Sequence, residues 1–327
     1  MKEEERAVVV KKLVIVIPAY NEEEVFPETV KEITEILEGM ISSNKVSADS
    51  KILFVNDGSK DNTWNLIINE QKNNELVTGI NFSRNFGHQN ALVAGLVTAS
   101  KDADMMITID ADLQDDVNAI EKMVDQYYAG FDVVYGVRDN RDTDTAFKRS
   151  TALTFYGIMK KLGVDMVPNH ADYRLMSQRA VLEFLKFKEE NLFIRGIVPL
   201  VGFPSTKVYY ARKERFAGES KYPLKKMLKF AWDGISSFSV VPIRAIMTLG
   251  VAVVIVAVGI LVYAVLEHAR GNTAQGWSSL MISLWFLGGV QLIGISVIGE
   301  YIGKIFNEVK HRPRFTIQDD TYTKVDK

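Results

Sequence analysis

Asp110 and Asp112 stand one residue apart at the end of an apolar run, residues 105–109, and together could bind a divalent cation. Two carboxylates supply the oxygen ligands that Mg²⁺ and Mn²⁺ prefer, and phosphate oxygens of a ligand can fill other coordination positions. A cation held there would neutralise charge that develops on a departing phosphate group. Two neighbouring aspartates are often only solvated turn residues, so their place at the end of an apolar strand is what favours a metal site.

Three more polar clusters follow apolar runs in the same part of the chain, at residues 18–22, 56–59 and 83–90. The aspartate pair begins a fourth cluster, 110–116. In a parallel sheet the carboxyl ends of the strands meet at one edge, and ligands bind there. The four clusters therefore predict a single site on one rim of a sheet.

The elements that would position these clusters alternate between strands and helices. Apolar runs rich in Val, Ile and Phe predict strands at 13–17, 52–55, 78–82, 105–109 and 132–135. Helical patterns lie between them near 23–38, 61–73, 88–99 and 117–128. This order predicts an α/β fold with a mostly parallel, Rossmann-like sheet and helices on both faces.

Composition excludes several classes of protein. Apolar residues make up 47% of the 327 residues and charged residues 24%, which is typical of a folded chain. The formal net charge of -2 gives no support to a nucleic-acid partner. The chain has no cysteine, which excludes disulfides, thiolate metal sites and a cysteine nucleophile. The apolar run near the N-terminus is too short for a signal peptide, so we expect the first domain to stay in the cytoplasm.

Two uncharged segments near the C-terminus, about 245–266 and 277–300, are each long enough to cross about 30 Å of hydrocarbon. Helices of a soluble core are the alternative interpretation, but such helices are seldom this long and uncharged. Basic residues flank the pair at Arg244, Lys304 and Lys310, which predicts a transmembrane hairpin with both termini in the cytoplasm. Small residues in the second span permit close helix contacts and hence oligomers: Gly288, Gly289, Gly294, Gly299 and Gly303.

The segment before the first span has the pattern of a basic amphipathic helix. Leu224, Leu228 and Trp232 share one helical stripe, and lysines lie off it. Such a helix can lie in the headgroup layer of a membrane, or it can pack on the preceding domain. We therefore expect a cytoplasmic α/β domain at 1–222, a juxtamembrane helix at 223–240, a hairpin at 241–304 and a cytoplasmic tail at 305–327.

The polar clusters, read in order, resemble a known enzyme family. IVIPAYNE (15–22), VNDGSKDNT (55–63), FSRNFGHQNAL (82–92) and DADLQDD (110–116) resemble family-2 inverting glycosyltransferases with the GT-A fold. ADYRLMS (171–177), RFAGESKYPLKKML (215–228) and GEYIGKIFNEVKHRP (299–313) resemble the polyprenyl-phosphate branch, especially bactoprenol glucosyltransferases. Dolichol-phosphate mannose synthases belong to the same branch. The resemblance covers nearly the whole chain.

For the donor, the resemblance implies a UDP-sugar, with Mg²⁺ or Mn²⁺ held by Asp110 and Asp112. The residues implied to contact that donor are Pro18, Tyr20, Asn21, Glu22, Asp57, Asn85, Ala111 and Gln114. Asp57 would meet the base or the ribose and Gln114 the sugar. Plainer interpretations stay open, because Asp57 could cap the next turn and His88 could cap or pack a helix start.

For the acceptor, the resemblance implies a polyprenyl phosphate in the lipid bilayer and a homo-oligomeric, tetrameric enzyme. Asp172 and Arg174 stand where related enzymes place catalytic residues, although they could also be a plain ion pair. The implied acceptor-phosphate ligands are Arg138, Lys148, Arg149, Arg215, Ser220 and Lys221. Glucose is the expected sugar, with N-acetylglucosamine, galactose and mannose as alternatives.

Two other functions are compatible with parts of this pattern. A processive polysaccharide synthase uses the same fold, but it usually carries more spans and a Q-x-x-R-W motif, which this sequence lacks. A membrane-tethered nucleotide-sugar sensor would not need both aspartates and the later basic motif. A phosphomonoester acceptor has its second pKa near 6, so it is mostly deprotonated at neutral pH and has little need of a base.

Overall fold

The computed structural model describes residues 10–139, 170–189, 193–211, 241–270 and 276–323. They form two compact units, one with the sheet and the chain from Arg312 onward, the other with two long helices. Several predictions lie outside the described residues: the acceptor ligands Lys148, Arg149, Arg215, Ser220 and Lys221, and the juxtamembrane helix at 223–240.

The first unit is built on an eight-stranded sheet with the order β7-β5-β6-β4-β1-β2-β3-β8. The strands are β1 (Leu13–Ala19), β2 (Lys51–Asn56), β3 (Val77–Phe82), β4 (Met105–Thr108), β5 (Val133–Arg138), β6 (His170–Ser177), β7 (Ser205–Tyr210) and β8 (Ile317–Asp320). All five predicted strands are present. Strands β4, β1, β2 and β3 run parallel to one another, so the ends that carry the polar clusters meet on one rim.

Two strands make the sheet mixed. β6 lies antiparallel between β4 and β5, and β8 lies antiparallel at the edge beside β3. Residues 305–327 were expected to form a separate tail, but part of that segment is an edge strand of the sheet. The segment Ile317–Asp320 reads IQDD, which is short and polar and gives no strand signal.

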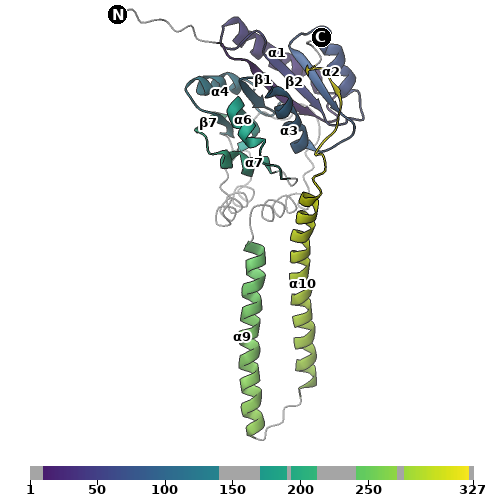
Figure 1. Ribbon diagram of the computed structural model, residues 1–327, viewed down its shortest axis with the longest axis vertical. Helices are drawn as coiled ribbons and strands as arrows, with labels where there is room; N and C mark the ends of the chain where they lie inside the picture. The colour runs from purple at the N-terminus through teal and green to yellow at the C-terminus, as the bar shows by residue number, and fades with distance from the viewer. Residues whose placement is uncertain (1–9, 140–169, 190–192, 212–240, 271–275, 324–327) are drawn as a thin grey trace, which may run out of the picture. The chain divides into compact units, whose positions relative to one another are not determined.

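Helices cover both faces of the sheet (Figure 1). They are α1 (Phe26–Ser42), α2 (Thr63–Gln71), α3 (His88–Ala99), α4 (Ala119–Tyr128), α6 (Gln178–Phe184) and α7 (Ile194–Ile197). On one face Leu13, Ile15 and Ile17 of β1 share a core with α1 and α4. On the other face α3 approaches so closely that a Cβ at Gly95 would lie 2.2 Å from Cγ1 of Val16. Every residue of β1 is consequently buried.

The second unit consists of α9 (Val241–Ala269) and α10 (Trp277–Val309), which run side by side (Figure 1). Their most apolar stretches, Val241–Ile260 and Phe286–Val309, have mean hydropathies of 2.5 and 1.4 and are only 0% and 6% buried. Both helices are long and apolar enough to cross a membrane, and they contain the two predicted spans. Such low burial is unlike that of core helices in a soluble domain.

Candidate active site

Hydrogen bonds join the loop after β1 to the loop after β2. Asn21 accepts a bond from the backbone N–H of Lys60 at 2.8 Å, and its own N–H donates to Oγ of Ser59 at 3.0 Å. The N–H of Glu22 donates to Oγ1 of Thr63 at 2.9 Å. Because the bonds run in both directions, the two loops form one rigid unit at the rim.

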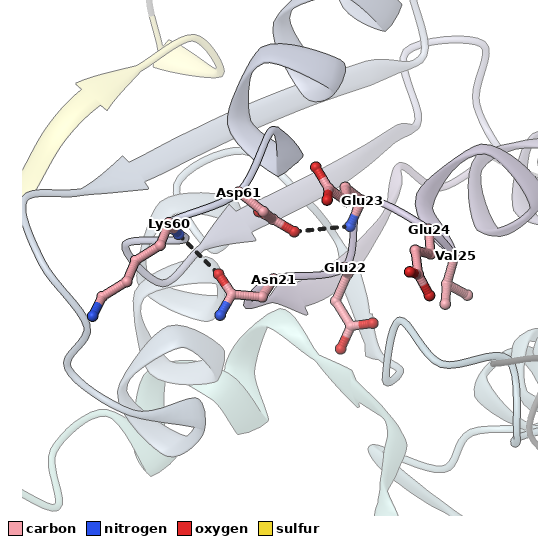
Figure 2. Close-up of a pocket in the computed structure, with 7 residues that line it drawn as sticks. All are labelled: Asn21, Glu22, Glu23, Glu24, Val25, Lys60 and Asp61. Carbon is pink, nitrogen blue, oxygen red and sulfur yellow. Dashed lines mark hydrogen bonds between the residues drawn. The ribbon is translucent and has the colours of Figure 1, made fainter. Parts of the chain in front are cut away.

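These two loops enclose a pocket of about 470 Å³. Figure 2 shows the lining residues: Asn21, Glu22, Glu23, Glu24, Val25, Lys60 and Asp61. Asn21 has a left-handed backbone with a φ of 55°, a conformation that asparagine tolerates well. Of the other predicted donor residues, Pro18 is buried inside β1, and Tyr20, just after that strand, is exposed. The pocket is acidic, so it suits a neutral polar group better than a phosphate.

Asp57, at the end of β2, holds the loop that follows β3. Its buried carboxylate accepts the backbone N–H groups of Phe86 at 2.6 Å and Gly87 at 2.9 Å. Burial raises the pKa of Asp57, and the two N–H bonds oppose the rise. Asn85 donates to the carbonyl of Asp57 at 3.2 Å. The carboxylate therefore faces the 83–87 loop, whereas the plainer interpretation of the sequence was that it caps the turn that follows β2.

The close approach of these loops requires a glycine. Gly58 has a φ of 63°, and a Cβ there would lie 2.4 Å from the backbone carbon of Arg84. A side chain at this position would force the 83–87 loop away from the β2 end. The NDGS motif thus positions the loop after β3 as much as it could position a ligand.

The predicted metal ligands follow β4 in a tight turn. The N–H of Gln114 donates to Oδ1 of Asp112 at 3.2 Å, and the carbonyl of Ala111 accepts Oγ1 of Thr29 at 2.8 Å. Ala111 and Gln114 are both buried. Leu113 has a φ of 54°, which is strained for a bulky residue and costs about 1–3 kcal/mol. Such strain persists where the surrounding structure imposes it, often at a functional site.

Strand β6 brings Asp172 and Arg174 to the end of β4, next to the turn that contains the aspartate pair. Thr108 at the end of β4 pairs with Arg174, and its Oγ1 donates to the carbonyl of Asp172 at 2.5 Å. Nη2 of Arg174 donates to Oδ1 of Asp172 at 2.7 Å. The second arginine on this carboxylate is Arg195 of α7, with Nη2 at 3.1 Å from Oδ2 and Nε at 3.3 Å from Oδ1.

His88, at the start of α3, lies between the two acidic positions. Its Nε2 is 3.4 Å from Oδ1 of Asp110 and 3.7 Å from Oδ2 of Asp172. The first predicted metal ligand and the predicted catalytic aspartate therefore share one histidine. From the sequence, a role for His88 in capping or packing the helix start was favoured over a catalytic one, and Arg195 was not among the predicted site residues.

The pKa values of this cluster follow from burial and from its charges. Burial alone would raise the pKa of Asp172, but His88, Arg195 and Arg174 outweigh it and hold that pKa well below its ordinary value. Burial would lower the pKa of His88, yet Asp172 and Asp110 raise it. Burial raises the pKa of Asp110 to about 6, with His88 opposing and Asp172 adding to the rise. Asp172 is thus a carboxylate at neutral pH and a weak proton acceptor.

The aspartate pair fits a divalent cation. Oδ1 of Asp110 is buried and accepts no hydrogen bond from the described residues, and the charges of Asp112, Asp115 and Asp172 act on it. Within the described ranges no group of three His, Cys, Asp or Glu side chains could hold a metal by itself. A cation bound here would need ligand oxygens in addition to Asp110 and Asp112, as a diphosphate would supply.

Arg138, predicted to bind the acceptor phosphate, has a protein partner. Its Nη2 donates to Oδ1 of Asp115 at 3.0 Å, and the hydroxyl of Tyr210 donates to the same oxygen at 2.6 Å. Burial would lower the pKa of Arg138, but Asp115 and Tyr210 raise it. Arg138 therefore braces the turn that contains the aspartate pair.

Comparison with known proteins agrees with this geometry. The family model for glycosyl transferase family 2 matches residues 14–185. A Bacillus subtilis protein named uncharacterized glycosyltransferase YkoT is 53% identical over 95% of this chain and 92% of the relative. The bactoprenol glucosyl transferase of Shigella phage SfV is 40% identical over 94% of this chain and 99% of the relative.

One solved structure that is similar to this chain is that of glucosyl-3-phosphoglycerate synthase from Mycobacterium tuberculosis in complex with phosphoglyceric acid. It is 16% identical, with a TM-score of 0.46 over 70% of this chain and 79% of that one. The expected GT-A-type architecture, a mixed sheet flanked by helices with the aspartate pair after β4, is confirmed. On its sequence, and with four motifs gathered at one rim, the chain belongs to glycosyl transferase family 2.

Proposed function

We propose that the protein transfers glucose from UDP-glucose to polyprenyl (undecaprenyl) phosphate with inversion, yielding a lipid-linked monosaccharide for cell-envelope glycosylation. The observation that carries this proposal is the cluster at the end of β4 and the start of β6, where His88 lies beside both Asp110 and Asp172, and Arg195 pairs with Asp172. The name bactoprenol glucosyl transferase, borne by several relatives about 40% identical to this chain, supports both glucose and a polyprenyl acceptor.

The donor would lie along the rim from the pocket to the aspartate pair. The acidic pocket between the β1 and β2 loops suits the neutral nucleoside, with Tyr20, Asn21 and Glu22 around the base. Asp110 and Asp112 would hold Mg²⁺ or Mn²⁺ against the diphosphate. When bound, the cation neutralises the charge on the leaving nucleoside diphosphate. Asn85 and Gln114 would contact the ribose or the sugar, within a frame shaped by Pro18, Asp57 and Ala111.

The acceptor phosphate would meet Arg195. The Arg195 side chain is 32% exposed, whereas that of Arg174 is 2% exposed, so only Arg195 can also reach a ligand. Asp172 would orient Arg195, because its own pKa is too low for a useful base. Arg174 would be the buried counter-ion that keeps Asp172 ionised. Arg138, Lys148, Arg149, Arg215, Ser220 and Lys221 remain proposed for the acceptor side.

These charges answer the main energetic problem of the reaction. Two negative groups about 4 Å apart repel by about 4 kcal/mol per pair of unit charges at an effective dielectric of 20. Arg195 and a protonated His88 would offset that repulsion as the acceptor oxygen approaches the anomeric carbon. That oxygen forms the new bond to carbon, the bond to the diphosphate breaks, and UDP leaves without a covalent enzyme intermediate.

Helices α9 and α10 would keep the enzyme on the membrane that contains its acceptor. Their basic flanks favour a cytoplasmic catalytic unit and cytoplasmic termini. The proposed domains are the catalytic domain at 1–222, the juxtamembrane helix at 223–240 and the hairpin at 241–304. The chain from Arg312 onward belongs to the catalytic unit. A homo-oligomer, a tetramer in the resembling family, is part of this proposal.

Labelled-sugar transfer tests the function. The full chain in lipid, supplied with labelled UDP-glucose, undecaprenyl phosphate and Mn²⁺ or Mg²⁺, should give a labelled lipid-linked monosaccharide. Labelled polymer would instead indicate a processive synthase, and UDP-glucose binding without turnover would indicate a sensor. Turnover only with N-acetylglucosamine, galactose or mannose donors would keep the reaction and change the sugar.

A further inference from the structure

The chain returns to the catalytic sheet after α10. Residues Arg314–Asp320, which we name the C-terminal strap, run along the outer edge of β3, where Figure 1 draws them in yellow. Asp319 and Asp320 pair with Asn81 and Ile80, and Ile317 pairs with Phe82. Because β8 is antiparallel to β3, the strap begins at the rim with the site and ends toward the opposite edge.

At the rim the strap packs on the loop that follows β3. The ring of Phe315 stacks on Phe82 with centroids 5.3 Å apart and planes 10° apart. Phe82 in turn contacts Phe86 edge to face, with centroids 5.6 Å apart. The carbonyl of Thr316 accepts the N–H of Ser83 at 3.1 Å. The 83–87 loop is therefore contacted by the strap on one side and bonded by Asp57 on the other.

This loop leads directly into the candidate active site. Phe86 and Gly87 donate to the Asp57 carboxylate, and the next residue, His88, lies beside Asp110 and Asp172. A shift of the Phe86 ring would also move the backbone N–H groups of Phe86 and Gly87, which bond the loop after β3 to Asp57 at the end of β2. No residue of the strap belongs to the motifs that the resemblance assigns to the donor.

We propose that the C-terminal strap is a positioning element for the nucleotide-sugar donor, acting through the Phe315–Phe82–Phe86 ring contacts on the 83–87 loop. The proposal rests on the donor site described under the proposed function. It makes donor affinity depend on a segment that the chain reaches only after its second long helix. The alternative is a purely structural role, in which β8 covers an exposed sheet edge and nothing more.

Tyr322 offers a matched control for that alternative. It lies just beyond the strap, and its hydroxyl donates to Asp102 at 2.5 Å, in the turn before β4 and hence at the edge opposite the site. Tyr322→Phe removes a tertiary contact of the same C-terminal segment without touching the loop. Phe315→Tyr keeps the stacked ring and is the conservative variant.

The experiment uses the full chain in lipid with UDP-glucose and Mn²⁺. Phe315→Ala should raise the KM for UDP-glucose about threefold to tenfold with little change in kcat, as expected for the loss of one aromatic contact. Phe315→Tyr should restore the KM, and Tyr322→Phe should leave it unchanged even if its Tm falls. An unchanged KM in Phe315→Ala, or an equal rise in Tyr322→Phe, would overturn the proposal.

A second measurement does not depend on turnover. Hydrogen exchange at the amides of Phe86 and Gly87 should become faster in Phe315→Ala and stay at the wild-type rate in Tyr322→Phe. If wild-type protein transfers no glucose while this contrast holds, the donor assignment is wrong and the strap still positions the loop. If transfer is normal and exchange at both amides is unaffected, the strap is only an edge cover.

Discussion

Two regions of the rim are held together in different ways. The loops after β1 and β2 are joined by hydrogen bonds between backbone amides and neutral or acidic side chains. The end of β4 and the start of β6 are instead joined by opposite charges. Ser59 and Thr63 tie the first pair of loops together. Two arginines and one histidine surround Asp172 in the second. Neutral bonds hold a shape with little dependence on a ligand, but a charge cluster changes its energy when another charge enters. Under the proposed function, the first region would recognise the nucleoside of the donor and the second would stabilise negative charge.

The largest effect is expected in the charged region, at the predicted metal ligand Asp112. Asp112→Asn removes an anionic ligand at nearly constant volume, and we expect kcat to fall about a thousandfold because the leaving diphosphate loses its counter-charge. Transfer should be measured with saturating Mn²⁺ in purified protein. Asp116→Asn is the matched control, since Asp116 belongs to the same motif and, among the described residues, its carboxylate bonds Asn118. Wild-type turnover in Asp112→Asn would remove the metal from this site.

Asp172→Asn should reduce kcat/KM about a hundredfold, because Arg195 loses the partner that orients it. The folded pKa of Asp172 is depressed, so its ionised form, and any stability it gives, would be lost only in strong acid. It therefore stays charged from pH 5 to 9, and the pH–rate profile should keep its shape in the variant. Loss of a limb of that profile would instead identify Asp172 as a base. Asp132→Asn, which breaks another arginine-paired carboxylate before β5, controls for stability.

Arg195→Ala tests whether the charged region serves the acceptor alone. Losing one charge-assisted contact should raise the KM for undecaprenyl phosphate about tenfold to a hundredfold, while the KM for UDP-glucose stays constant. Arg179→Ala provides the control. Arg179 also pairs with an aspartate, but the pair lies at the opposite ends of the strands, after β6 and before β5. Equal changes in both KM values would mean that Arg195 only supports the fold.

The same contrast explains what the sequence predicts. The donor-side motifs lie within a few residues of strands that the apolar runs indicate, so their convergence follows from parallel order alone. The cluster around Asp172 needs β6 to enter the sheet antiparallel between β4 and β5, and α7 to bring Arg195 beside it. Periodicity does not specify that insertion, and a four-residue helix has no readable pattern.

The roles of Asp57 and Arg138 were also beyond sequence reasoning. Arg138 was predicted to bind a ligand, and Asp57 to bind a ligand or cap a turn, yet each has a nearby protein partner, Asp115 and the 83–87 loop respectively. A motif states which residue types a site needs, but it does not state which of them hold the others in place. The polar strand β8 was missed for a related reason, because it is stabilised by pairing with β3 rather than by burying apolar side chains.

The smallest effect is expected on the recognition side, at Ser59. Its hydroxyl accepts the N–H of Asn21 and donates to Oδ1 of Asn56 at 2.5 Å, so Ser59→Ala removes one neutral contact between the loops and one within the segment that follows β2. We expect the KM for UDP-glucose to rise about threefold to tenfold and the KM for undecaprenyl phosphate to stay constant. Ser43→Ala, which removes a hydroxyl bonded to two carbonyls at the end of α1, is the control. A rise in the acceptor KM would show that the two regions are coupled, because a neutral contact on the donor side would then influence the charge cluster.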